Sequence, residues 1–155
     1  MDDLLFPQRD SRKIHRAIQQ RDLLALDQAL TCGAVNEPCD GLLPLHFAVL
    51  EEWVPGVEAM LRYGANVNAA DADGKTALHH AAMIETCGAV GTLLLAHGAM
   101  LNAKTRYDST PLDIARATNN PESIAFFEQR GGLSGRWSID LFGRGPGGRG
   151  YGPYR

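Results

Sequence analysis

The chain has 155 residues, of which 45% are hydrophobic and 21% are charged, and this composition suits one soluble domain. The longest apolar runs, such as residues 89–96, are far shorter than the roughly 18 residues that a membrane-spanning helix needs. The amino terminus lacks the basic start of a secretory signal, so we expect a cytoplasmic protein without a membrane segment.

Charge is distributed unevenly along the chain, whose formal net charge is −3. Residues 131–155 contain four arginines and one aspartate, so this part carries +3 and the remainder carries −6. The asymmetry predicts an acidic body with a basic tail. Cys32, Cys39 and Cys87 have no CxxC spacing, so we expect free thiols rather than a disulfide framework or a zinc site; a redox switch is a less favoured alternative.

Residues 12–36 predict a first pair of helices, preceded by an amino-terminal extension of residues 1–11. Ile14, Ala17 and Ile18 recur at helical spacing, and Leu26 and Leu30 continue the pattern in a second segment. The other faces of the pair are polar, as the solvent side of a terminal repeat requires. We therefore interpret this pair as a cap.

Three further helix pairs are predicted over residues 40–68, 73–102 and 107–131. Their spacing is regular, because Leu45 to Leu78 is 33 residues (78 − 45) and Leu78 to Leu112 is 34 (112 − 78). Such a period indicates stacked supersecondary units rather than one globular core. Each pair starts where a capping hydroxyl or a proline favours the first helical turn, and the start without a hydroxyl is expected to be the weakest. In chain order these starts are Leu43-Pro44, Thr76-Ala77 and Thr110-Pro111.

Each second helix is expected to end at a glycine. Gly33, Gly64, Gly98 and Gly131 follow the apolar stripes, at the point where a left-handed residue lets the chain leave a helix. Residues 65–75 are rich in Asn, Asp and Gly, which predicts a turn that projects as a short hairpin.

Together these features resemble the ankyrin repeat. The pattern Thr-Pro-Leu-His-x-Ala, two helices, Gly-Ala-x-Val-Asn and a β-turn, with a period of about 33 residues, is that of this family. The resemblance covers residues 12–131, with Asp113 in place of the motif histidine in the last unit. It implies an all-α ankyrin-repeat solenoid of about four units including the amino-terminal capping pair, with β-turn or hairpin loops between helix pairs.

Catalysis and metal binding are not expected. His15, His46 and His79 stand at equivalent positions, and since their period is that of the repeat, hydrogen bonds that steady neighbouring loops are favoured over a row of metal ligands. His80 and His97 have no carboxylate or cysteine partner at ligand spacing along the chain. The chain also lacks a Gly-rich phosphate loop after a strand, a nucleophile elbow and an HExxH motif. We assign no catalytic residue, no metal ligand and no cofactor.

A solenoid presents its loops and first helices along one concave side, which suits an extended protein surface. The resemblance implies a module that binds a partner protein there as an adaptor, inhibitor or scaffold, and we expect a monomer. Leu42, Leu50, Met83, Ile84 and Tyr107 are apolar where a merely soluble surface would carry charge, although partial burial against neighbouring helices is the alternative. The implied partner-binding residues are Asp40, Leu42, Leu50, Glu51, Asp73, Lys75, Met83, Ile84, Lys104, Arg106, Tyr107 and Ser109.

Trp53 stands beside Pro55-Gly56 in an irregular turn between paired helices. It can cover the helix ends or contact a partner. We favour packing.

Beyond Gly131 the period stops, and residues 132–155 form a Gly/Arg-rich tail. Its hydrophobic segment, 136–142, is expected to dock on the last repeat, with a partner-binding motif as the alternative. The anchors of this segment are Trp137, Ile139, Leu141 and Phe142. Arginine and tyrosine in residues 143–155 raise the alternative of a nucleic-acid-associated protein, which we disfavour because only three arginines lie there.

Overall fold

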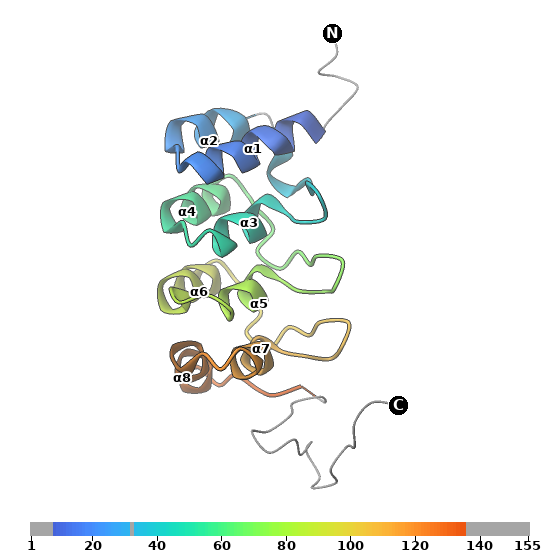
Figure 1. The fold of residues 1–155 in the computed structure, drawn as a ribbon, viewed down its shortest axis with the longest axis vertical. Helices are drawn as coiled ribbons and strands as arrows, with labels where there is room; N and C mark the ends of the chain where they lie inside the picture. Colours follow the sequence, from blue (N-terminus) through green and yellow to red (C-terminus); the bar gives the residue numbers. More distant parts are fainter. Residues whose placement is uncertain (1–7, 32, 136–155) are drawn as a thin grey trace, which may run out of the picture.

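The computed structural model describes residues 8–31 and 33–135, which form eight α-helices in four stacked pairs (Figure 1). A short 3-10 helix, η2, spans Ala34–Asn36. The described residues include no β-strand, so the prediction of an all-α solenoid is confirmed. The pairs are α1 (Gln8–Gln20) with α2 (Leu23–Leu30), α3 (Pro44–Leu50) with α4 (Val54–Arg62), α5 (Ala77–Ala81) with α6 (Cys87–Ala96), and α7 (Pro111–Ala117) with α8 (Pro121–Gln129).

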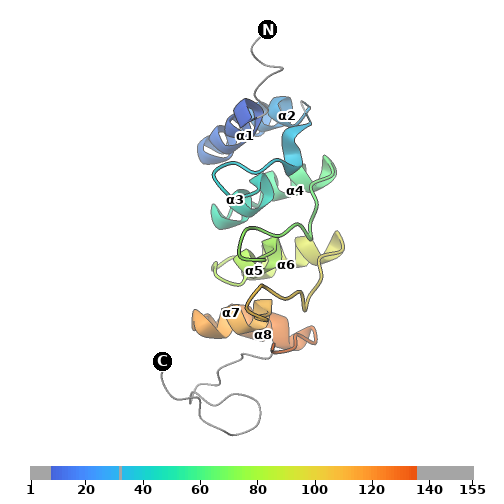
Figure 2. The ribbon, with the colours of Figure 1, turned by 90° about the vertical axis from the view of Figure 1, so that its right-hand side faces the viewer.

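The helices form two columns. The first helices of the pairs, α1, α3, α5 and α7, contact one another in order, and α2, α4, α6 and α8 do the same beside them (Figure 2). The loops that lead from one pair to the next project together on one side of the stack. The turns within the pairs lie on the opposite side (Figure 1).

Helix α1 begins at Gln8, four residues before the expected start at 12 (12 − 8). No proline or glycine lies between Gln8 and Arg12, so nothing in this stretch interrupts helical hydrogen bonding. The buried face of the helix comprises Ser11, Ile14, Ala17 and Ile18.

The core runs the length of the stack between the two columns. Leu45 and Leu78 are at most 2% exposed, and burial of one such side chain contributes about 1.5–3 kcal/mol. Ala48, Ala81 and Ala115 are completely buried, and their small side chains let neighbouring helices approach closely. Because each pair buries its apolar face against the next pair, stability is a sum of terms within and between units.

Local signals at the helix starts act as predicted. At α7, Thr110 Oγ1 accepts a bond from the Asp113 amide (3.3 Å), while Asp113 Oδ2 accepts one from the Thr110 amide (2.9 Å). At α5, the Thr76 amide donates to Nδ1 of His79 (3.0 Å). Helix α3 begins after Leu43 with no side-chain capping bond, as expected for the weakest start.

The four glycines after the second helices adopt the left-handed conformation. Gly33, Gly64, Gly98 and Gly131 have φ values of +87°, +84°, +88° and +82°. This confirms the prediction, because side chains strongly disfavour this backbone region.

Asparagines one period apart tie each unit to the next. Asn36, Asn68 and Asn102 occupy equivalent positions. Asn68 Oδ1 accepts a bond from the amide of Met100 (2.8 Å), and Asn102 Oδ1 accepts one from the amide of Leu133 (2.7 Å). The chain after Gly131 is therefore placed like the start of a further unit.

Asp113 adapts this last unit to its end position. His79, at the equivalent place one unit earlier, lies 3.1 Å from the carbonyl oxygen of Ser109 through Nε2 and donates to it. Asp113 instead accepts, through Oδ2, a bond from the amide of Gly135 (2.7 Å). The change from a donor to an acceptor side chain thus suits a backbone amide partner.

Trp53 packs inside the fold. Its side chain is 6% exposed, and a Cβ built on Gly56 would lie 2.1 Å from the indole Cε3 atom. The indole thus fills the space that a side chain at position 56 would take. The preference for packing over a partner contact agrees with this burial.

Candidate interaction surface

The loops before α5 and α7 are each built around one side-chain oxygen. Asp71 Oδ1 accepts bonds from the amides two and four residues further on, both at 2.9 Å. Thr105 Oγ1 does the same in the next loop, at 3.2 Å for both amides. Side-chain bonds of this kind stabilise turns locally, so the tips of both loops have a defined backbone.

The loop before α3 is tighter. Cys39 and Leu42 exchange backbone hydrogen bonds of 2.8 and 3.1 Å and form an isolated antiparallel bridge. The two residues between them, Asp40 and Gly41, have φ values of +52° and +84°. Positive φ at both central residues is the signature of a type I′ turn. The expected hairpin is thus a two-residue turn here.

Contacts between loops hold neighbouring tips together. The amide of Arg106 donates to the carbonyl oxygen of Asp73 (3.1 Å), and the guanidinium lies 3.7 Å from the Asp73 carboxylate. A Cβ at Gly74 would lie 2.8 Å from the Arg106 nitrogen, so the approach requires glycine. The same guanidinium lies 5.8 Å from the ring centre of Tyr107.

The structure places one group of the predicted partner-binding residues on these loops. Tyr107 is 61% exposed. Asp40, Lys104 and Arg106 are also exposed, whereas Leu42, Asp73, Lys75 and Ser109 are half-buried. We define the loop-tip surface as these four exposed residues together with Asp73, which contacts Arg106: Asp40, Asp73, Lys104, Arg106 and Tyr107.

A second group of the predicted partner-binding residues lies at or just after the ends of α3 and α5. Leu50 ends α3 and Glu51 follows it, about 9 Å along the helix axis from its start. Met83 and Ile84 follow α5 in the same way. The structure thus does not bring these four residues together with the loop tips. The expectation that Ile84 is exposed is wrong: it is 7% exposed and belongs to the core, because the turn after α5 folds it inward.

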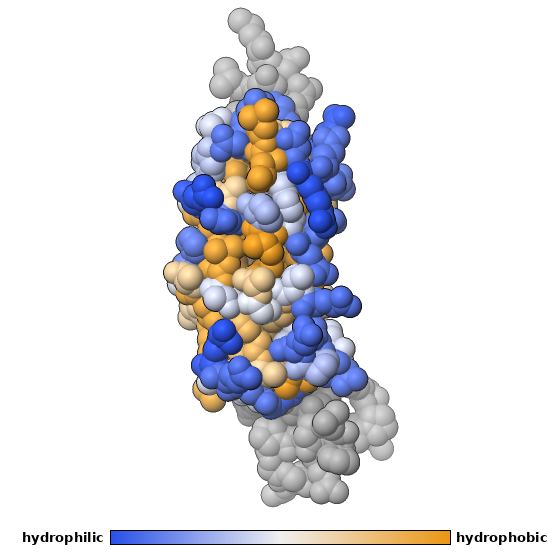
Figure 3. Space-filling model, turned by 90° about the vertical axis from the view of Figure 1, so that its left-hand side faces the viewer, coloured by the Kyte–Doolittle hydropathy of each residue, from blue (hydrophilic) through white to orange (hydrophobic). Residues whose placement is uncertain are grey.

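The face opposite the loops carries apolar side chains. Figure 3 shows them gathered in a band along the stack. Leu23 and Leu24, at the start of α2, are 48% and 69% exposed, and Met83 is 40% exposed. Leucine at a helix start is expected to belong to the buried stripe, so these two residues were not among the predicted surface residues.

Two of the motif histidines bond to the following loop, as predicted. His46 Nε2 lies 3.0 Å from the carbonyl oxygen of Ala69 and donates to it, in the same way as His79 to Ser109. Burial lowers the pKa of His46 to about 4, with a further contribution from His80, and burial also lowers the pKa of His79. Both rings are therefore neutral at physiological pH.

His15 departs from the prediction. Its Nδ1 lies 2.9 Å from the carbonyl oxygen of Ser11 in the same helix, and its ring stacks on Phe47 at 4.7 Å between ring centres. Helix α1 is the first in the stack, and its histidine contacts the next unit through ring stacking.

The structure gives His80 a carboxylate partner that sequence spacing did not reveal. Its Nε2 lies 3.0 Å from Asp71 Oδ2, and both side chains are less than 10% exposed. Asp71 precedes His80 by nine residues, and a turn lies between them. Metal-ligand pairs that are recognised from sequence are closer together, so this partner was not predicted. His97 instead contacts the carbonyl oxygen of Leu93 in its own helix (2.9 Å).

The cysteines and a surface hollow are weaker candidates for a functional site. Cys39 and Cys87 are buried free thiols, and burial raises the pKa of Cys87.

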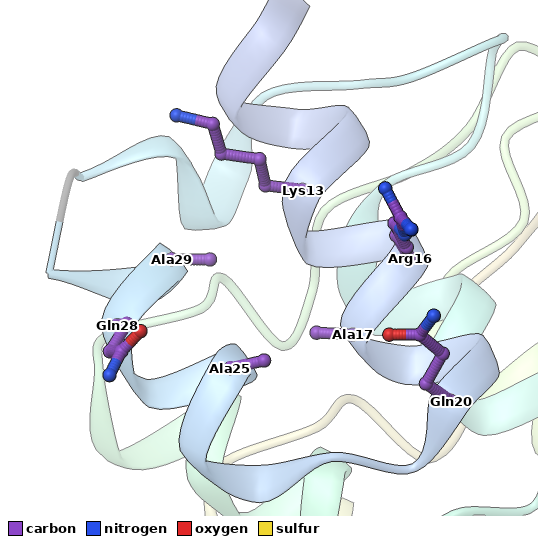
Figure 4. A pocket seen from close by; sticks show the side chains of 7 residues that line it. All are labelled: Lys13, Arg16, Ala17, Gln20, Ala25, Gln28 and Ala29. Atoms are coloured by element: carbon purple, nitrogen blue, oxygen red, sulfur yellow. The ribbon is translucent and has the colours of Figure 1, made fainter.

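An open hollow lies between α1 and α2 (Figure 4). Ala17, Ala25 and Ala29 point toward one another there, and exposed polar side chains such as Lys13 surround them. Methyl groups form its centre, so we assign it no ligand.

The tail anchors Trp137, Ile139, Leu141 and Phe142, the segment 136–142 and the Arg- and Tyr-containing end lie outside the described residues, as does Cys32. Among the described residues, no helix is long and apolar enough to cross a membrane.

The chain belongs to the ankyrin repeat family. The family model for ankyrin repeats in three copies matches residues 14–105 and 45–131. Ankyrin repeats are generally protein–protein interaction modules and are typically not enzymes.

Individual relatives match the repeat region. Human Rabankyrin-5 is 36% identical over 101 residues, which are 64% of this chain and 9% of that protein. Mouse RelA-associated inhibitor is 36% identical over 110 residues, 63% of this chain and 13% of that protein. Protein PhlB of Serratia liquefaciens is 38% identical over 111 residues, 70% of this chain and 48% of that protein. The chain thus spans a small part of the first two and about half of the third.

Proposed function

We propose that this chain binds a partner protein through the loop-tip surface and the adjoining inner helices, and that it acts by occupancy as an adaptor, inhibitor or scaffold. The name of one relative, RelA-associated inhibitor, describes an inhibitor and supports this kind of role. The proposed mechanism includes no covalent chemistry.

The observation that carries the proposal is the exposed pair Arg106 and Tyr107 on a loop held by internal bonds. Arginine and tyrosine are enriched among the residues that dominate binding energy at protein interfaces. The loop backbone is held by Thr105 Oγ1 and by the bond to Asp73. Because these contacts already restrict the loop, little backbone entropy would be lost on binding.

Charge along the loop tips suggests what the partner presents. The first loop carries the exposed acidic residues Glu37 and Asp40, whereas the third carries the exposed basic residues Lys104 and Arg106. A complementary partner would place basic groups against the first loop and acidic groups against the third. Such complementarity sets orientation and association rate more than affinity.

Affinity capture with matched variants tests the proposal. Tyr107→Glu should lose the proteins that the intact chain recovers. Met100→Glu is the control, since Met100 is 60% exposed, almost equal to Tyr107, but lies in the connection after α6. Recovery of the same proteins by both variants would show that the loop tips are not the binding surface.

Two further variants test the orientation of the partner and the choice of binding face. Arg106→Glu should slow association with a captured partner, and a charge reversal on the partner should restore the rate. Met83→Glu tests the opposite face: loss of binding there alone would move the proposed surface to the turns within the helix pairs.

A further inference from the structure

Three side chains meet at the junction of two units: His46, Asp71 and His80. His46 lies in α3, His80 in α5, and Asp71 in the loop between the two units. One potential ligand atom from each residue lies within 4.8 Å of those from the other two. The rings of His46 and His80 have their centres 4.9 Å apart.

We propose that these three side chains bind a divalent transition-metal ion of the zinc class. Imidazole nitrogen and carboxylate oxygen are ordinary ligands for zinc, and three protein ligands leave a fourth position to water. The ion would tie α3 to the loop and helix of the next unit. This inference does not depend on the proposed partner binding.

Hydrogen bonding at His46 leaves one nitrogen for a metal. Its Nε2 donates to the carbonyl oxygen of Ala69, while its Nδ1 is buried and has no hydrogen-bond partner among the described residues. A metal-bound histidine usually donates its other ring N–H to a carbonyl or carboxylate, which fixes the ring orientation. His46 already donates to such a carbonyl oxygen, and its Nδ1 makes no hydrogen bond that would compete with a metal.

Asp71 and His80 provide the other two atoms. The Oδ1 atom of Asp71 is held by the amides of Asp73 and Lys75, which leaves Oδ2 directed at His80. His80 Nε2 and Asp71 Oδ2 are 3.0 Å apart. Two ligand atoms of a tetrahedral zinc ion lie about 3.3 Å apart, given bond lengths of about 2.0–2.1 Å.

Binding of an ion would require the three ligand atoms to move closer together. Closing a 4.8 Å gap to the tetrahedral spacing takes a contraction of about 1.5 Å at most. Coordination at Nε2 of His80 would move its proton to Nδ1, which is buried without a partner among the described residues. His80 and Asp71 would thereby exchange their mutual hydrogen bond for bonds to the ion.

Charges around the three side chains act in opposite directions on a cation. Asp71 supplies a carboxylate, whereas Lys75 is a nearby positive charge that opposes the ion.

Titration of the metal-free 155-residue chain with zinc chloride tests the proposal by calorimetry and by thermal unfolding. We expect one ion bound per chain at this site and a rise in Tm with zinc concentration, since a ligand that binds the folded state stabilises it. His80→Gln and Asp71→Asn should weaken binding by about tenfold or more. Asp71→Asn keeps the Oδ1 acceptor for the loop amides, so the loop should still fold.

A control variant and a cobalt spectrum distinguish binding at this site from binding by other side chains of the chain. His97→Gln removes an exposed histidine and should leave affinity unchanged. Cobalt should give visible absorption bands without a thiolate charge-transfer band, because the ligands are nitrogen and oxygen. Circular dichroism should show that each variant is folded.

Three results would overturn the proposal: no zinc-dependent change in heat or Tm, unchanged affinity in folded His80→Gln, or a thiolate band that disappears when cysteines are replaced by serine.

Discussion

Acidification should destabilise the fold through His46. This ring is completely buried, and its pKa is about 4 against an ordinary value of 6.5, chiefly because burial disfavours its charged form and secondarily because of His80. The bond to Ala69 and the charge of Asp71 raise the pKa but do not compensate. The folded state thus resists protonation, whereas the unfolded chain takes up the proton readily.

The sign and size of the effect follow from this difference in pKa. Well above pH 6.5 the ring is neutral in both states, and His46 contributes no pH dependence. As the pH falls below that value, the unfolded state binds the proton first and stability is lost. The loss from this residue amounts to about 2 kcal/mol at pH 5 and about 3 kcal/mol at pH 4, where the folded ring begins to charge.

Urea unfolding of the intact chain and of His46→Gln, followed by circular dichroism from about pH 7.5 to about pH 4, measures this contribution. Glutamine does not titrate, and its amide can still donate to the Ala69 carbonyl. The variant should be less stable near neutral pH but lose stability less steeply on acidification, while His79, His80 and the carboxylates titrate in both proteins. Parallel stability curves for the two proteins across this range would refute the reasoning.

Three further predictions concern stability. Leu43→Thr should raise the free energy of unfolding by about 1 kcal/mol because α3 lacks a capping side chain, and a lower Tm would contradict this. Gly56→Ala should cost about 1–3 kcal/mol and change the fluorescence of Trp53, since the added carbon would collide with the indole; unchanged stability and emission would show that the ring moves freely. A chain that ends at Gly131 should melt below one that ends at Gly135, because it loses the bonds of Leu133 and Gly135 to the last unit; equal Tm values would show that these bonds add nothing.

Much of the fold was predictable because its signals act within a few residues. A left-handed residue is needed wherever a second helix ends, so Gly64 and Gly98 mark the ends of units in the sequence. The capping residue Thr110 likewise acts on an amide three residues away. Repetition of such local signals at 33 and 34 residues determined the solenoid.

The interaction surface was only partly predictable, because exposure depends on how a turn is directed. Position within the repeat identified Arg106 and Tyr107 as loop residues. The same reasoning treated Met83 and Ile84 alike, yet Met83 is 40% and Ile84 7% exposed. Only the path of the turn after α5 determines which of the two adjacent apolar side chains faces the core.

The helix pairs, their period and the family could be predicted without coordinates, because helix propensity, capping and glycine conformation are local properties of the chain. Which groups meet across units depends on how the pairs stack. The Arg106 amide reaches the Asp73 carbonyl, and His46 lies beside His80, only after consecutive pairs stack. Those contacts join residues about a full repeat apart, and their geometry depends on loop shape and helix packing, which spacing along the chain does not encode.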